Sequence, residues 1–301
     1  MTFLDAAPAT TVAASPRRDG LRELGVLALV YVGYAASRVL ADDTLSPAVT
    51  RAVRILDVER LLRLDVEGGL NRWFVEHDTV GVAASFYYAG AHYVLTLLVV
   101  IWLFLRHRDA YAPARLALVG ATGVALVAYL TMPTAPPRLL GGWTDLLALH
   151  SAAGWWGGEA SAPQGMGWLT NQLAAFPSMH AGWALWVALA VTHVVRRRAV
   201  VVFAWTHAVL TGIVVVGTGN HWVLDVVAGW AVVLIAWQAV GPPSVGNETG
   251  PTAAGAADPV PHAPARGTHS APERTEGPIR FPRPRDSEDD ANADADRPAR
   301  H

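Results

Sequence analysis

The chain contains 301 residues, of which 52% are hydrophobic and only 16% are charged, whereas an average soluble domain carries roughly 25% charged residues. This composition excludes an ordinary soluble protein. A net charge of −2 with no arginine-rich face argues against a nucleic-acid partner. The chain has no cysteine, and all 23 basic residues are arginine, which excludes disulfides, thiolate sites and lysine Schiff bases.

Six apolar segments approach or reach the roughly 17–25 residues needed to cross a hydrocarbon core of about 30 Å. In chain order they are approximately Leu24–Leu40, Val80–Leu105, Pro113–Met132, Ala181–Val195, Val200–Val216 and His221–Val240. The connection 41–79 carries charges of both signs, which indicates a charged helix lying at the membrane interface. The sequence therefore predicts an all-α polytopic membrane protein with a six-helix transmembrane bundle.

Arginine placement predicts the orientation of this bundle, because cytoplasmic loops are enriched in basic residues. Arginines are concentrated before the first segment, between the second and third, and between the fourth and fifth: Arg17, Arg18, Arg22, Arg106, Arg108, Arg115, Arg196, Arg197 and Arg198. The connection 133–180 carries one basic residue, and the connection 217–220 carries none. We therefore expect both termini in the cytoplasm of a multi-pass cell-membrane protein, and these two connections outside.

Composition divides the chain into three parts. Residues 1–20 form a cytoplasmic N-terminal segment, and the apolar run after them favours an uncleaved signal anchor over a cleaved signal peptide. Residues 21–240 form the membrane domain. Residues 241–301 hold 11 of the 20 prolines and none of the 12 tryptophans, so they cannot bury enough apolar surface to fold. The composition of these residues therefore predicts a disordered cytoplasmic tail.

A proline-rich motif, PTAPPRLL at Pro133–Leu140, follows the third segment. Its prolines end the helix and stiffen the backbone, and they place Arg138 near the membrane surface. A fixed guanidinium suits a phosphate, because its fork of donors contacts two oxygens at once. The alternative is a simple proline turn with an arginine that reaches the lipid headgroups.

A second motif, FPSMHAGWALW at Phe176–Trp186, opens the fourth segment. Pro177 and Ser178 are typical of a helix start, which leaves backbone N–H groups pointing outward as an anion site. His180 falls in the first turn of this helix, beside any bound anion. The alternative is a structural histidine at the membrane interface.

A third motif, GTGNHWVLDVVAGW at Gly217–Trp230, opens the sixth segment. His221 and Asp225 are four residues apart and would share one face of a helix. A carboxylate buried in a membrane span is a functional candidate. It could fix the tautomer of His221 and leave the other ring nitrogen as a nucleophile, although a purely structural hydrogen bond is equally compatible. All three motifs fall on the same predicted face of the membrane.

Pro-Pro-Arg, Pro-Ser-x-His and His-x-x-x-Asp, in this order at successive outward-facing span ends, resemble the type-2 phosphatidic acid phosphatase superfamily. The first two motifs are most similar to the membrane branch that contains the fungal inositol phosphorylceramide synthases and their bacterial relatives. The resemblance covers roughly residues 21–240. Two departures stand out: the chain lacks the lysine of the wider superfamily's first motif and the Ser-Arg that opens its third. This pattern fits the phosphotransferase-like branch better than the common phosphatases.

The resemblance also implies a role for each motif residue. His221 would form a phospho-histidine, Asp225 would orient it, and His180 would protonate the leaving oxygen and later activate the acceptor. Arg138 and Ser178 would bind the substrate. No metal or other cofactor is implied.

The expected function is that of a membrane lipid phosphotransferase or phosphatase of the inositolphosphotransferase-like type. Its donor would be a phospholipid or a polyprenyl phosphate, and its acceptor water, a polyol or a lipid hydroxyl. Three alternatives remain: a plain lipid-phosphate or polyprenyl-pyrophosphate phosphatase, a metal site built from the two histidines and the aspartate, and a non-enzymatic lipid carrier or scaffold. Tyr88 and His92, four residues apart in the second segment, are either interior residues or substrate contacts.

Overall fold

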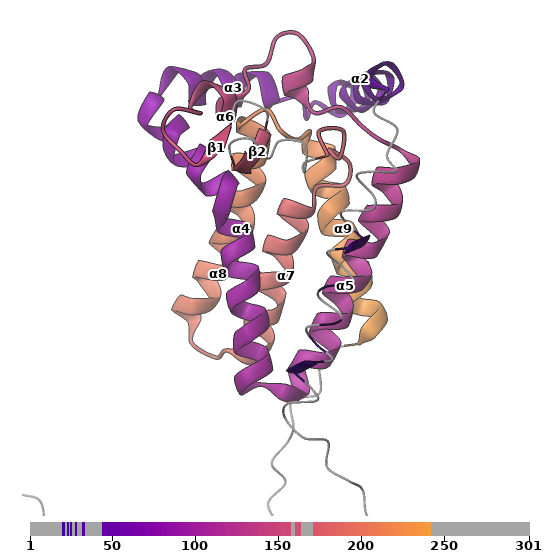
Figure 1. Ribbon diagram of the computed structural model, residues 1–301, viewed down its shortest axis with the longest axis vertical. Coiled ribbons are helices and arrows are strands. Elements are labelled where there is room, and N and C mark those ends of the chain that lie inside the picture. Colours follow the sequence, from indigo (N-terminus) through magenta and orange to yellow (C-terminus); the bar gives the residue numbers. More distant parts are fainter. Residues whose placement is uncertain are drawn as a thin grey trace, which may run out of the picture. The chain divides into compact units, whose positions relative to one another are not determined.

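The computed structural model describes residues 44–157, 160–163 and 171–241, together with isolated positions between 20 and 33 (Figure 1). The chain divides into two units, 1–248 and 249–301, and every described residue belongs to the first. The first predicted span, Leu24–Leu40, falls largely outside the described residues, as do the predicted tail beyond Gly241 and most of the predicted segment 1–20.

The described part of the chain is mainly helical, as predicted. Its elements are α2 (Leu45–Leu62), α3 (Glu67–Glu76), α4 (Asp78–Arg106), α5 (Arg108–Thr131), the 3₁₀ turn η1 (Pro137–Leu139), α6 (Leu146–Leu149), β1 (Trp156–Gly157), β2 (Ala160–Pro163), α7 (Met179–Val194), α8 (Arg198–Gly217) and α9 (Val223–Val240). The one departure from an all-α chain among these elements is the short antiparallel pair β1–β2.

Four of the described helices, α4, α5, α8 and α9, are long and apolar enough to cross a membrane. Helix α7 is also apolar but has only 16 residues. These five helices coincide with the second to sixth predicted segments. The chain is therefore a membrane protein, and the described helices bear out four of its predicted spans by length and composition.

The connection 41–79 forms two helices, α2 and α3, where the sequence analysis expected one. Helix α2 ends because Arg63 adopts a left-handed conformation (φ 58°), and its N–H bonds back to the Arg60 carbonyl. Such a residue terminates a helix and turns the chain. Both helices lie at the same end of the bundle as α6 and the β1–β2 pair (Figure 1).

Helix α7 is the centre of the bundle and contacts α4, α5, α8 and α9. Its small residues allow this, because Ala181, Ala184 and Ala188 are fully buried. A Cβ added to Gly229 of α9 would lie 2.1 Å from the Ser178 carbonyl oxygen. Glycine therefore lets the backbone of α9 approach the start of α7, and this close approach brings the second and third motifs together.

Candidate active site

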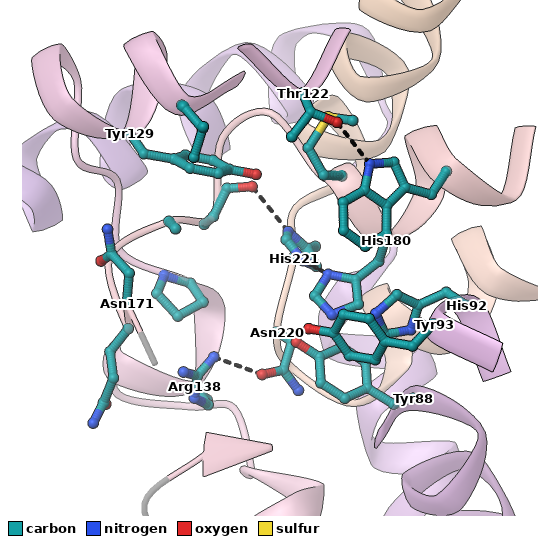
Figure 2. A pocket seen from close by; sticks show the side chains of 17 residues that line it. Tyr88, His92, Tyr93, Thr122, Tyr129, Arg138, Asn171, His180, Asn220 and His221 are labelled. Carbon is teal, nitrogen blue, oxygen red and sulfur yellow. Dashed lines mark hydrogen bonds between the residues drawn. The ribbon is translucent and has the colours of Figure 1, made fainter. Parts of the chain in front are cut away.

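The imidazole rings of His180 and His221 meet at the N-terminal end of α7. His180 is the second residue of α7, whereas His221 lies in the turn between α8 and α9, where its N–H bonds to the Val215 carbonyl at 3.1 Å. The Nε2 atom of His221 lies 3.3 Å from Nδ1 of His180 (Figure 2). The structure thus brings together two histidines that are 41 positions apart in the sequence.

The other nitrogen of His221, Nδ1, is held by the backbone. It lies 2.9 Å from the Ala175 carbonyl oxygen, which can only accept, so Nδ1 carries the proton and donates it. Nε2 then keeps its lone pair. Burial lowers the pKa of His221 to about 3, which keeps the ring neutral at physiological pH.

Asp225 lies behind His221, but not in the way the sequence analysis predicted. Helix α9 begins at Val223, so His221 precedes it and the two residues do not share a helix face. The Oδ2 atom of Asp225 accepts the Trp222 N–H at 2.8 Å and lies 3.4 Å from Nδ1 of His221, farther than the Ala175 carbonyl does. Asp225 therefore caps the helix and places its carboxyl group behind the ring, while the backbone carbonyl holds the proton.

Arg138 is anchored at three points beside the histidine pair. Its N–H bonds to the Gly219 carbonyl at 2.8 Å, its Nη1 donates to Oδ1 of Asn220 at 2.6 Å, and its Nε lies 3.2 Å from Oδ2 of Asp145. The side chain is only 7% exposed. The guanidinium is fixed, as the proline motif predicted, but sequence reasoning missed both of its side-chain partners.

Ser178 caps α7, as predicted, because its Oγ accepts the Ala181 N–H at 3.4 Å. The side chain is fully buried, and the Ser178 N–H bonds to the Asp225 carbonyl at 2.9 Å. Ser178 does not line the cavity described next. Its position is that of a residue that holds α7 against α9.

A cavity of about 120 Å³ opens in front of the two histidines and Arg138. Roughly 10–15 Å³ of such space holds one water, so the cavity has room for a much larger group. Its walls come from α4, α5, α7 and the connections before α7 and α9: Tyr88, His92, Tyr93, Thr122, Leu126, Tyr129, Pro136, Arg138, Asn171, Gln172, Ala174, Ala175, Met179, His180, Trp183, Asn220 and His221 (Figure 2).

Comparison with known protein families places the chain in one of them. A family model described as the PAP2 superfamily matches residues 53–239, which is well over half of the chain. The chain belongs to the PAP2 superfamily. No curated protein and no solved structure matches it. PAP2 membership makes the chain a phosphatase or phosphotransferase, which removes the main support for a carrier or scaffold.

The cavity wall includes two α4 residues whose role the sequence left open. Tyr88 and His92 are buried and line the cavity. The Tyr88 ring stacks on His180 with 4.7 Å between ring centroids, and the His92 ring lies 4.1 Å from the same histidine. Helix α4 therefore holds the His180 ring in place.

Two buried glutamates, which sequence reasoning missed, cap α9, the helix that follows His221. Oε1 of Glu67 accepts the Val223 N–H at 3.0 Å, and Oε1 of Glu59 accepts the Leu224 N–H at 2.7 Å. Both side chains are at most 1% exposed. With Asp225 they provide three carboxyl groups for the N-terminus of α9, where a partial positive charge favours anions.

This cluster shifts the titration of Glu59. Burial, followed by the nearby carboxylates of Glu67 and Asp225, raises the pKa of Glu59 to about 9, although its bond with the Leu224 N–H acts in the opposite direction. Glu59 therefore stays protonated at neutral pH. The cluster buries fewer than three full negative charges behind His221.

The metal-site alternative finds no support in the described residues, which contain no group of three or more His, Cys, Asp or Glu side chains able to hold a metal ion. His180 and His221 face the cavity, but Asp225 lies behind His221 and does not line it. Arg138 would also place a positive charge where a metal would bind.

Proposed function

We propose that this chain is an integral membrane lipid phosphotransferase that works through a phospho-histidine on His221, at a site on the outer side of a six-span bundle whose termini are cytoplasmic. The observation that carries the proposal is the position of His221 Nε2. It is unprotonated, faces the cavity and lies 3.3 Å from His180. A neutral imidazole with one nitrogen tied to a carbonyl is ready to act as a nucleophile.

The reaction would proceed in two displacements. In the first, Nε2 of His221 attacks the phosphorus of a lipid, the bond from phosphorus to the lipid oxygen breaks, and His180, which enters this step as the imidazolium, gives the proton on its Nε2 to that oxygen. In the second, an acceptor hydroxyl attacks the phosphorus, the bond from phosphorus to Nε2 of His221 breaks, and His180 takes up the hydroxyl proton and becomes the imidazolium again. Nε2 of His180 is buried and has no hydrogen-bond partner among the described residues, which leaves it for this exchange.

Substrate binding requires His180 to move. Its Nδ1 occupies the direction of the lone pair on Nε2 of His221, because the two atoms are at hydrogen-bond distance. An incoming phosphorus must take that place. Tyr88 and His92, which contact the other side of the His180 ring, would define where it moves.

The charge at the site favours transfer from a phosphodiester. Arg138 is the one permanently charged cation among the described residues that line the cavity, and Asp145 already pairs with it. A phosphate monoester carries a charge of about −1.5 to −2 at pH 7, and a diphosphate carries more, whereas a phosphodiester carries a single charge. A headgroup phosphotransferase of the inositolphosphotransferase type therefore fits better than a phosphatase for lipid phosphates or polyprenyl pyrophosphates.

In this arrangement Arg138 holds a phosphate oxygen. Its Nε and one N–H of Nη1 are engaged with Asp145 and Asn220, which leaves the other N–H of Nη1 and both of Nη2 for the substrate. Asp225 stabilises the positive charge that develops on the His221 ring. Ser178 contributes by capping α7, which orients the first turn that carries His180.

The experiment supplies purified protein with a diacyl phosphodiester lipid as donor and a polyol as acceptor, and measures headgroup phosphate and the acceptor joined to headgroup phosphate by mass spectrometry. We expect the joined product from the wild type and none from His221→Ala. The matched control is His193→Ala, on the same helix as His180 but outside the cavity, which should retain activity. Headgroup phosphate as the sole product would make water the acceptor and the enzyme a hydrolase, and full activity of His221→Ala would refute the nucleophile.

A further inference from the structure

Asn171 contributes an amide to the cavity wall in the segment that leads into α7 (Figure 2). Its Oδ1 accepts the Leu173 N–H at 3.0 Å. This bond fixes the orientation of the amide, because the opposite orientation would set an NH₂ group against an N–H group. Nδ2 therefore has to be the free end.

The Nδ2 group of Asn171 is buried and has no hydrogen-bond partner among the residues that the structure describes. A buried donor without an acceptor costs free energy, so most such groups in folded proteins are satisfied by protein or water. A buried donor without an acceptor in the wall of this cavity therefore indicates a group that binds a ligand.

The proposed phosphate contacts leave a need for such a donor. Arg138 keeps the two N–H groups of Nη2 and one of Nη1 once its contacts with Asp145 and Asn220 are made. The Nδ2 group of Asn220 cannot help, because it donates to the carbonyl and hydroxyl oxygens of Thr218. A phosphodiester with a hydroxyl-rich headgroup presents more oxygen acceptors than one guanidinium can bind.

We propose that Asn171 is a substrate-binding residue whose Nδ2 donates a hydrogen bond to an oxygen of the phosphodiester or of its polar headgroup. The inference rests on the proposed function. A neutral donor suits this position, since it binds an oxygen without adding the second positive charge that would favour phosphate monoesters. Asn171 thus supplies part of the contact for which the wider superfamily uses additional basic residues.

The test measures binding rather than turnover. Two probes are titrated against the full-length protein in detergent and followed by thermal shift: glycerophosphoinositol, which carries a phosphodiester and a hydroxyl-rich headgroup, and orthovanadate, which carries the phosphoryl-like centre alone. The variants are Asn171→Ser, which keeps a hydroxyl oxygen for the turn with Leu173, and Asn171→Asp, which keeps the turn acceptor and removes the donor. The melting temperature without ligand controls for folding.

We expect Asn171→Ser to weaken glycerophosphoinositol binding about tenfold, and Asn171→Asp to weaken it further, because a carboxylate repels the phosphate. Equal weakening of orthovanadate binding by Asn171→Ser assigns the contact to a phosphoryl oxygen. Unchanged orthovanadate binding by that variant assigns it to a headgroup hydroxyl. Both results support a contact from Nδ2.

The inference is overturned if both variants bind both probes within twofold of the wild type, or if the wild type binds neither. It is also overturned if Asn171→Ser lowers the unliganded melting temperature while Asn171→Asp binds like the wild type, since the effect would then come from the turn. Turnover is measured separately. An inactive wild type that shows binding dependent on Asn171 would count against the proposed reaction alone.

Discussion

Oε1 of Glu59 accepts the Leu224 N–H at 2.7 Å, and this bond ties α2 to the first turn of α9, three residues after His221. Glu67 makes the equivalent bond to Val223 from α3. Two helices outside the membrane-spanning set therefore anchor the helix start that follows His221. This relationship gives α2 and α3 a function in the site, although neither lines the cavity.

Removal of the Glu59 carboxyl should destabilise this helix start. Glu59→Ala leaves the Leu224 N–H buried without an acceptor, which costs about 1–3 kcal/mol, and should lower the free energy of unfolding by that amount and reduce kcat. Glu59→Gln keeps a carbonyl oxygen for Leu224 and should resemble the wild type in both. Chemical unfolding and turnover of the two variants check this, and equal losses would show that the bond is unimportant.

The raised pKa of Glu59 predicts a pH dependence of stability. Between its ordinary value of 4.5 and the folded value of about 9, the folded chain binds one proton more than the unfolded chain. The contribution of Glu59 to the free energy of unfolding is fully present below pH 4.5 and is lost as the pH rises through 9. The melting temperature of the wild type relative to Glu59→Gln should therefore fall across this window, and a constant difference would contradict the shift.

Asp225→Asn should reduce activity without abolishing it. The amide oxygen can still accept the Trp222 N–H, and the Ala175 carbonyl still holds the proton on Nδ1 of His221, so the tautomer survives. What is lost is the negative charge behind the ring. A hydrogen bond to a charged group contributes about 1.5–3 kcal/mol, which corresponds to a decrease in kcat of about 10- to 100-fold. A loss as large as that of His221→Ala would instead make Asp225 the residue that fixes the tautomer.

A side chain at Gly229 should disrupt the packing of α9 against the start of α7. Gly229→Ala places a methyl group 2.1 Å from the Ser178 carbonyl oxygen, which forces the two helices apart and separates His180 from His221. We expect a lower melting temperature and a loss of activity of at least about tenfold. Gly123→Ala in α5 is the matched control.

A Cβ at Gly123 has no neighbour within 4 Å, so alanine there should be neutral or stabilise the helix by about 0.5–1 kcal/mol. If Gly229→Ala behaves like Gly123→Ala, the close approach of α7 and α9 does not determine the site. Membrane insertion and melting temperature are measured for both variants, so that a loss of folding is distinguished from a loss of catalysis.

The sequence predicted the five described apolar helices well, because runs of apolar residues and the prolines that interrupt them are local signals. It also identified the residues that meet at the cavity, His180, His221 and Arg138, because each follows or opens a helix at the same end of the bundle. It predicted that His221 and Asp225 lie close together, and Nδ1 of His221 is 3.4 Å from Oδ2 of Asp225. It did not predict that the Ala175 carbonyl accepts the hydrogen bond from Nδ1, nor that the turn after Gly217 delays the start of α9 to Val223.

The partners of the site residues could not be predicted, because they are distant in sequence. Asn220 and Asp145 bind Arg138 only once the chain has folded. The position of Glu59 could have been recognised from the sequence. It follows Ala48, Ala52 and Leu56 at helical spacing, so it lies on the apolar side of α2. A carboxyl group at such a position indicates a buried polar contact, whereas the charge content of 41–79 as a whole indicated an interfacial helix.

The most direct test of the proposed phospho-histidine on His221 is to trap it. The wild type, His221→Ala and the control His193→Ala are incubated with phospholipid donor, quenched in alkali, which preserves phospho-histidine, and digested for mass spectrometry. We expect an adduct with the mass of headgroup plus phosphate on the peptide that contains His221, both in the wild type and in the control. We expect no adduct in His221→Ala. Turnover of donor by His221→Ala, or an adduct on another residue, would contradict it.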